Sequence, residues 1–201
     1  MDKPAPTDHP VNDLVRDRWS PRAFADRAIG DAEIDSLLEA ARWAPSARNS
    51  QPWRFLVTRR EDAAEFERML ACLVPGNQRW ARRAAVLMVA VAVLADHKDR
   101  PLPHALYDTG QAVAWLSAEA TARGIRVHQM GGFDPDAVRA SYGVPEGARP
   151  ITAIALGYPG DPEGLDDDLR EQELATRNRR AQSEFVFARS WDQARRGSMP
   201  A

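Results

Sequence analysis

The sequence predicts an α+β fold in which a mixed sheet is flanked by helices. Segments with helical periodicity alternate along the chain with short apolar segments of strand length. The longest apolar run, Ala84 to Ala95, contains no charged residue. It is too short to cross a membrane and suits a central strand that is buried on both faces.

The first part of the chain is expected to hold two helices before the first strand. Val11 to Arg18 predicts one or two helical turns, which end near Ser20-Pro21 because a residue before proline avoids the helical region. Asp31 is suited to be the N-cap of a second helix that ends near Pro45. The apolar face of this helix would contain Ile34, Leu37, Leu38 and Ala41. A strand, a helix and a turn are then expected at Trp53–Thr58, Asp62–Leu73 and Pro75-Gly76.

The second part begins with the apolar strand at Ala84–Val91 and continues with a long helix from Pro103 to about Arg123. This helix carries an apolar stripe, and Gly124 is a natural stop for it. The remaining regular elements are expected at Ile125–Met130 (strand), Asp134–Tyr142 (helix) and Ile151–Tyr158 (strand). From Pro159 onward an exposed excursion and an amphipathic tail at Phe185–Trp191 are expected. Residues 1–10 are interpreted as a flexible tail and residues 11–201 as a single domain.

Composition excludes several classes of protein. Hydrophobic residues make up 44% and charged residues 28%, as in ordinary globular proteins. The net charge of −2 gives no electrostatic reason to expect nucleic acid or a membrane as a partner. Cys72 is the one cysteine, so it can form neither a disulfide framework nor a zinc cluster, and we interpret it as a core thiol. No secretory signal is visible, so the cytoplasm is the expected location.

Two groups of arginines are candidates for binding a phosphate. The sequence has no GxxxxGK[ST] loop and no GxGxxG after a strand, so a phosphate would have to be held by side chains. Arg18 and Arg22 bracket Ser20, and Arg177 and Arg179 lie near the C-terminus. Guanidinium groups bind phosphate with planar paired donors. The residues alone leave open that these arginines are solvated surface charges.

Two other segments suggest contact with a flat ligand. The run Pro45-Ser46-Ala47-Arg48-Asn49-Ser50-Gln51-Pro52-Trp53 predicts a rigid, polar loop between a helix and a strand. Gly131-Gly132 follows Met130 and either marks a turn or allows a ligand to approach the backbone closely.

Together these motifs resemble the nitroreductase family of FMN-dependent oxidoreductases. They occur in order as Arg18-Trp19-Ser20-Pro21-Arg22, Pro45 to Trp53, Met130-Gly131-Gly132-Phe133 and Arg177-Asn178-Arg179. The resemblance spans Val11 to about Phe187. It implies a nitroreductase-like fold and an intertwined homodimer with FMN at the subunit interface.

The resemblance also implies a role for each motif. Arg18, Ser20 and Arg22, next to Trp19, would hold the phosphate and ribityl end, and Arg177 and Arg179 would complete the phosphate site. A partner subunit would bring its loop to the ring system, and Gly131 and Gly132, beside Met130, would place an N–H at flavin N5. The loop residues concerned are Pro45, Ser46, Ala47 and Asn49.

The implied activity is transfer of hydride from NAD(P)H through flavin N5 to a small organic acceptor by a ping-pong mechanism. A nitroaromatic, a quinone or an activated alkene is the expected acceptor, and no side chain is assigned as catalytic acid or base. His128, two residues before Met130, is interpreted as structural, with contact to the substrate as the alternative. Ala47 stands where relatives often carry a hydroxyl residue, and the short segment Leu94–Leu102 suggests an open pocket. Reductive dehalogenation, reduction of a specific aldehyde or enal, and a non-catalytic flavin-binding module remain alternatives.

Overall fold

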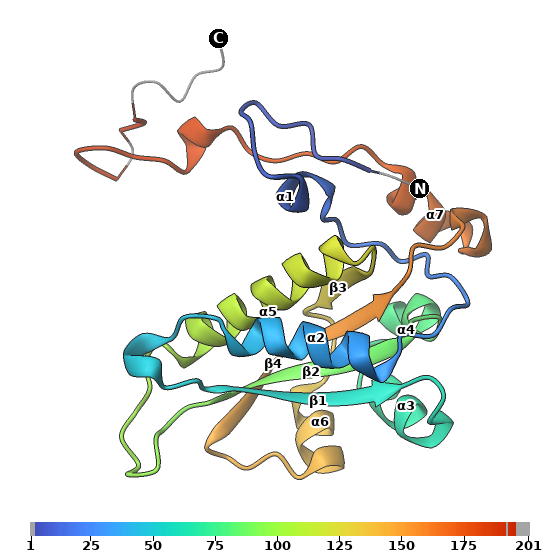
Figure 1. The fold of residues 1–201 in the computed structure, drawn as a ribbon, viewed down its shortest axis with the longest axis horizontal. Helices are drawn as coiled ribbons and strands as arrows, with labels where there is room; N and C mark the ends of the chain where they lie inside the picture. The colour runs from blue at the N-terminus through green and yellow to red at the C-terminus, as the bar shows by residue number, and fades with distance from the viewer. Residues whose placement is uncertain (1–2, 192, 196–201) are drawn as a thin grey trace.

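The computed structural model describes residues 3–191 and 193–195. Its centre is one antiparallel sheet with the strand order β1-β2-β4-β3 (Figure 1). The strands are β1 (Trp53–Arg59), β2 (Val86–Val93), β3 (Arg126–Met130) and β4 (Ala148–Gly157). The α+β class is confirmed. The sheet is not mixed among these strands, because β1 and β4 both run opposite to β2, and β3 runs opposite to β4.

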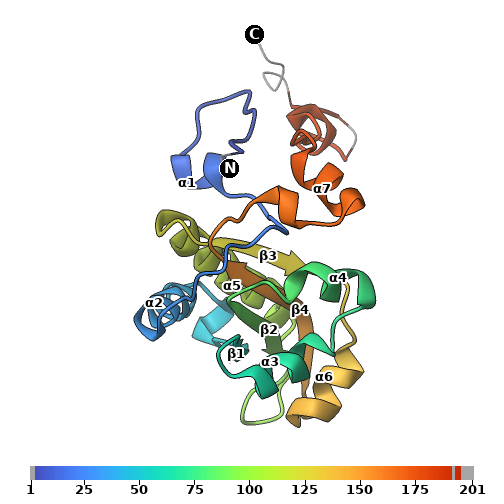
Figure 2. The ribbon, with the colours of Figure 1, turned by 90° about the vertical axis from the view of Figure 1, so that its right-hand side faces the viewer.

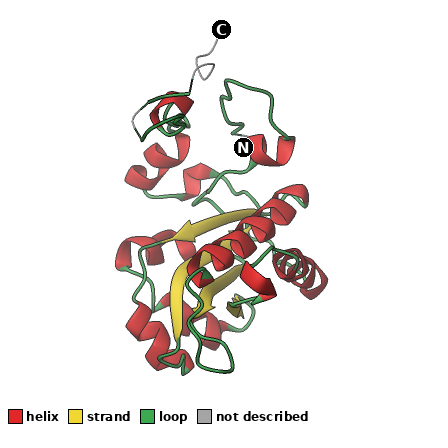
Figure 3. Ribbon diagram, turned by 90° about the vertical axis from the view of Figure 1, so that its left-hand side faces the viewer, coloured by secondary structure: helices red, strands yellow, loops and turns green. Residues whose placement is uncertain are grey.

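Helices cover both faces of the sheet (Figure 3). One face packs against α2 (Asp31–Arg42) and α5 (Ala105–Ala122), and the other against α3 (Ala63–Leu70), α4 (Pro75–Ala81) and α6 (Pro135–Tyr142). Two further helices, α1 (Asp13–Asp17) and α7 (Asp167–Leu174), lie above the sheet in both Figure 1 and Figure 2. The short 3-10 turns are Ala47–Asn49, Pro162–Gly164 and Gln182–Glu184.

The side chains of β2 explain why the core has two halves. Val86, Met88 and Ala90 belong to the cluster under α2 and α5, whereas Leu87 and Val89 point into the cluster under α3, α4 and α6. Successive side chains of a strand alternate between faces, so a strand covered on both sides needs apolar residues throughout. The central position expected for this apolar run is confirmed.

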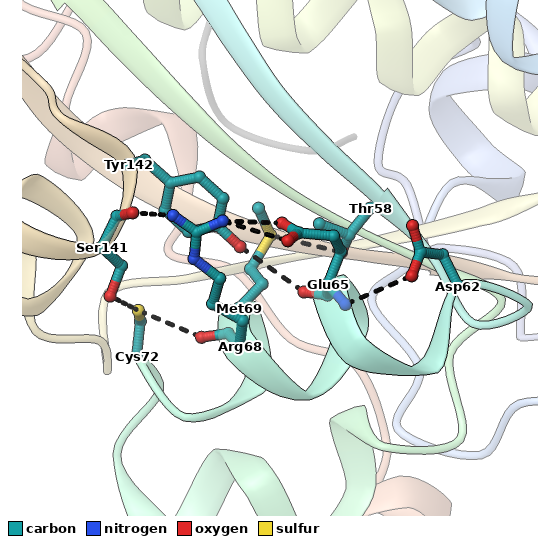
Figure 4. Close-up of polar contacts among 8 residues, drawn as sticks. All are labelled: Thr58, Asp62, Glu65, Arg68, Met69, Cys72, Ser141 and Tyr142. Atoms are coloured by element: carbon teal, nitrogen blue, oxygen red, sulfur yellow. Dashed lines mark hydrogen bonds and ion pairs between the residues drawn. The ribbon is translucent and has the colours of Figure 1, made fainter.

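A polar cluster joins α3 to the end of α6 (Figure 4). The Arg68 guanidinium binds the Glu65 carboxylate and the Ser141 carbonyl, and it lies 4.4 Å from the ring centroid of Tyr142. Cys72 lies beside it with a buried thiol, in contact with the Arg68 carbonyl and the Ser141 hydroxyl. The interpretation of Cys72 as a core thiol is therefore confirmed.

Several expected elements differ from the structure. Pro75 and Gly76 begin α4 rather than a turn, because proline suits the first turn of a helix, where its missing N–H has no intrahelical partner. The excursion after Pro159 contains α7, which buries Leu169 and Glu173. Gly30, not Asp31, is the N-cap of α2.

The ends of two helices also differ from their expected positions by two or three residues. The helix expected at Asp62–Leu73 ends at Leu70, and α5 begins at Ala105 rather than at Pro103. The tail expected at Phe185–Trp191 contains no helix.

Among the described residues no helix is both long and apolar enough to cross a bilayer. Lys3 and Ala5 contact the rest of the chain, although residues 3–10 form no helix or strand. Met1, Asp2 and residues 196–201 of the expected tail and domain lie outside the described residues. The cytoplasmic location stays a prediction.

Candidate functional site

Three arginines from the two ends of the chain form a positively charged cluster. Burial lowers the pKa of Arg18, and the neighbouring charges of Arg177 and Arg179 lower it further. The Arg18 guanidinium donates to the Ser20 hydroxyl at 3.3 Å. None of the three forms an ion pair with a carboxylate in the described part of the chain. A bound anion would relieve this repulsion, which is the chemistry of a phosphate site.

Arg177 holds this cluster together through the backbone. Its guanidinium donates to the carbonyls of Lys3, Arg16 and Arg18 at 2.6, 2.9 and 2.8 Å. Burial and the charge of Arg179 lower the pKa of Arg177. The side chain therefore fixes the segment that carries Arg18, while its charge adds to the positive potential there.

Glu173 is a buried position beside the arginine cluster that sequence reasoning missed. Its side chain is buried in α7, and the carboxylate accepts the Arg22 N–H at 2.9 and 3.1 Å and the Ala23 N–H at 3.1 Å. The Lys3 ammonium donates to the Glu173 carbonyl at 2.5 Å. One carboxylate thus orients the backbone of the Arg18–Arg22 segment. No sequence signal distinguished Glu173 from the other acidic residues of this charged stretch.

His128 connects the Arg18–Arg22 segment to β3. Its Nδ1 lies 2.8 Å from the Pro21 carbonyl oxygen, so Nδ1 carries the proton, since a carbonyl can only accept. The imidazole also lies against Trp80, with 4.5 Å between ring centroids. Burial lowers the pKa of His128 to about 4; the Pro21 contact opposes the shift, and the charges of Arg22 and Arg18 add to it. The ring is therefore neutral near pH 7, as a structural histidine would be.

The glycine pair follows His128 at the end of β3. A Cβ on Gly132 would lie 2.6 Å from the Asn77 amide nitrogen and 2.9 Å from a Val74 methyl carbon. The Gly132 carbonyl accepts from both residues, at 2.9 Å from the Asn77 side chain and 3.1 Å from the Val74 N–H. Gly131 by contrast faces open space. Neither glycine N–H donates to another described residue, so both donors are free for a ligand.

The loop from Pro45 to Trp53 has an unusual backbone. Arg48, Asn49 and Gln51 have φ angles of 53°, 55° and 46°, in the left-handed region that residues other than glycine rarely adopt. Each such residue costs of order 1 kcal/mol and persists only where its surroundings enforce it. Strain of this kind is concentrated at ligand-binding loops.

Specific hydrogen bonds hold this loop in place. The Ala47 N–H donates to the buried Asp108 carboxylate of α5 at 2.9 Å, and the Gln51 N–H donates to the Ser46 hydroxyl at 3.1 Å. Asn49 and Ala47 are exposed, so they face away from the core of their own subunit.

One subunit does not bring all the predicted residues together. The Arg18–Arg22 segment contacts β3, one edge of the sheet, through Pro21 and His128, and Arg177 is bound to the backbone of Arg18. The Pro45–Trp53 loop leads into β1, at the other edge. Three strand spacings, roughly 14 Å, separate these edges. The two groups of predicted residues therefore meet opposite edges of the sheet.

Comparisons with known proteins agree on one family. The model described as "Nitroreductase family" matches residues 15–158. A 15.4 kDa protein from the ask 5' region of Mycolicibacterium smegmatis is 35% identical over 145 residues, covering 69% of this chain and 97% of that protein. A putative NADH dehydrogenase/NAD(P)H nitroreductase of Archaeoglobus fulgidus is 31% identical over 154 residues, covering 74% and 84%. A crystal structure of an oxidoreductase containing FMN superposes with a TM-score of 0.89 at 32% identity, covering 94% of this chain and 96% of that one.

We expect Glu173→Gln to lower the free energy of unfolding by about 1.5–3 kcal/mol, because an amide cannot replace a carboxylate that accepts several backbone N–H groups. Denaturant unfolding measures the change. Glu171→Gln is the matched control, since Glu171 is exposed on the same helix and its replacement should alter stability by less than about 0.5 kcal/mol. Equal stability of the two variants would contradict the role given to Glu173.

His128 should titrate with a midpoint of about 4 in the folded protein, below its ordinary value of 6.5. The unfolded chain then binds a proton between these values and the folded protein does not, so stability falls as the pH drops from 6.5 toward 4. Ring chemical shifts followed by NMR give the midpoint. His128→Asn keeps a donor for the Pro21 carbonyl but cannot titrate, and its stability should depend less on pH in this window. A midpoint near 6.5 would show that the ring is not buried as described.

Proposed function

Because the chain belongs to the nitroreductase family, we propose that it is an FMN-dependent oxidoreductase that takes hydride from NAD(P)H and passes it to a small organic acceptor in two alternating half-reactions. The use of FMN and NAD(P)H follows from the family and from relatives named for these compounds. The two half-reactions and the acceptor class of nitroaromatics, quinones or activated alkenes belong to our proposal.

One observation carries the assignment of the site. An arginine cluster without carboxylate partners lies next to a histidine-bearing strand that ends in two free glycine N–H groups. A phosphate needs the first feature, and a flat heterocycle with a hydrogen-bond acceptor at its edge needs the second. The residues present therefore fit FMN.

Each residue would contribute position or electrostatics. Arg18 and Arg179, held by Arg177, would bind the phosphate, and Ser20 would donate to it or to the ribityl chain. Arg22, whose backbone Glu173 fixes, would place positive charge beside the ring. When bound, FMN supplies the two-electron chemistry that no side chain here provides.

The ring system would be enclosed from several sides. Gly131 and Gly132 would donate an N–H to the ring edge, with the buried Met130 behind them and the buried Trp19 beside Arg18. The loop residues Pro45, Ser46, Ala47 and Asn49 of a partner subunit would cover the ring face.

Exposed apolar groups support a homodimer. On α5, Leu106, Tyr107 and Trp115 are 41%, 69% and 52% exposed, and a partner surface would cover apolar side chains of this kind. The segment after α7 extends away from the sheet and its helices in Figures 1 and 2, and Phe185 on it is 59% exposed. A second subunit would bury both surfaces, and it would bring the Pro45–Trp53 loop to the arginine cluster.

A single preparation tests the proposal. Sedimentation monitored in the visible band of the flavin should show a species of twice the 22.3 kDa chain mass, and NADPH or NADH added without oxygen should bleach that band. A colourless protein that does not take up FMN would refute the function, and a flavin-carrying species of one chain mass would refute the shared site. A yellow dimer that neither nucleotide bleaches would favour the alternative of a non-catalytic flavin-binding module. Assays across acceptor classes would separate the proposed acceptors from reductive dehalogenation and from reduction of an aldehyde or enal.

We expect Arg18→Ala to weaken FMN binding about 10- to 150-fold, because it removes a charge-assisted contact worth roughly 1.5–3 kcal/mol. Titration of the apoprotein with FMN measures the affinity, and circular dichroism checks the fold. Arg83→Ala is the control, since Arg83 is an exposed arginine between α4 and β2. Unchanged affinity in Arg18→Ala would remove this residue from the phosphate site.

A further inference from the structure

A cavity of about 870 Å³ lies between residues 47–54 and residues 93–108. One wall is the strained loop after α2, and the other is the connection from β2 to α5. The volume is that of a site for a small organic molecule. It is separate from the arginine cluster of its own subunit, which lies at the other edge of the sheet.

The charged residues that line this cavity are three arginines and two aspartates: Arg48, Arg54, Arg100, Asp96 and Asp108. Both aspartates already have partners. Asp96 binds the Arg100 guanidinium at 2.6 Å, and Asp108 accepts the Ala47 N–H. Arg48 and Arg54 form no ion pair with a described carboxylate, and with Arg100 the arginines outnumber the aspartates on the lining by three to two.

These two arginines are held in position by the loop itself. Arg54 donates to the carbonyls of Gln51 and Trp53 at 3.1 and 2.7 Å, contacts that orient the guanidinium and leave its charge unpaired. Arg48 has a left-handed backbone, with φ 53° and ψ 27°, and its exposed side chain makes no hydrogen bond to a described residue. A strained loop thus carries a free guanidinium on the cavity wall.

We propose that this cavity binds the anionic group of one of the two substrates, a carboxylate or a phosphate, with Arg48 and Arg54 as specificity-determining residues. The proposal rests on the proposed function, because the same loop would cover the flavin of the partner subunit. The anion belongs either to the phosphates of the hydride donor or to an acidic substituent on the acceptor. Paired guanidinium donors suit both.

Isothermal titration of the flavin-loaded protein with pyrophosphate and with 4-nitrobenzoate tests binding without turnover. At least one of these anions should bind, and Arg48→Asn or Arg54→Gln should weaken that binding about tenfold, the loss expected for one charge-assisted contact. Asparagine is chosen at position 48 because it tolerates the left-handed backbone. Arg48→Lys should recover part of the affinity, and Arg83→Ala should bind as the unaltered protein does.

Kinetics then identify the source of the anion. If the hydride donor carries it, Arg48→Asn raises KM for NADPH and leaves KM for 1-benzyl-1,4-dihydronicotinamide, which has no phosphate, unchanged. If the acceptor carries it, the variant raises KM for 4-nitrobenzoate but not for nitrobenzene. Either result supports the proposal.

Three results would overturn it: neither anion binds, both arginine variants bind as tightly as the unaltered protein, or Arg48→Asn loses FMN. The last would assign Arg48 to the flavin site instead. A different result would contradict the proposed function and leave the anion site intact. If the protein takes up no FMN but Arg48→Asn still weakens anion binding to it, the cavity is an anion site and only the oxidoreductase function is lost.

Discussion

The buried carboxylate of Glu173 is the interaction on which the arrangement of the site depends. It accepts three hydrogen bonds from two consecutive N–H groups near the N-terminus, and it comes from a helix near the C-terminus. Arg177 ties the same two regions together through backbone carbonyls. Both sets of contacts join residues at least 150 positions apart in sequence. Together with the Pro21–His128 contact to the sheet, they fix the segment that carries Arg18, Ser20 and Arg22.

The sheet supplies the second fixed reference. The Pro21 carbonyl meets His128 on β3, and two residues later β3 ends at the glycine pair. The segment that carries Arg18 and Arg22 and the free N–H groups of the glycine pair are thus both attached to β3. The strained Pro45–Trp53 loop lies at the opposite edge of the sheet. It leads directly into β1, and its Ala47 N–H donates to the Asp108 carboxylate of α5. The two halves of the candidate site are thus attached to opposite edges of one sheet.

Patterns within short stretches of sequence predicted most of the fold. The apolar run of β2 indicated a buried central strand, since alternate residues had to satisfy two faces, and the stripe on α5 indicated its packing. The same reasoning failed where local signals were ambiguous. Pro75-Gly76 is equally compatible with a turn and with a helix start, and strand direction depends on long-range pairing that periodicity does not encode.

Of the candidate site, only the residues that belong to recognisable motifs could be predicted from the sequence. Arg18, Gly131 and the Pro45–Trp53 loop stand out in the sequence because their residue types are unusual together. Glu173 does not stand out in the sequence. It differs from the other acidic residues around it in that its side chain is buried, and the sequence gives no sign of which acidic residue will be buried. The contacts of Arg177 with backbone carbonyls were missed for a similar reason. Every residue has a carbonyl, so the sequence does not show which carbonyls an arginine will bind.

The neutral ring of His128 has a consequence for the electric field around the glycine pair. The charges that act on His128 come from Arg22 and Arg18, and arginine does not release its proton under biological conditions. The imidazole, the one group there whose ordinary pKa lies near neutrality, holds no charge until strongly acidic conditions are reached. The contribution of His128 to the field at the end of β3 is therefore the same throughout the near-neutral pH range.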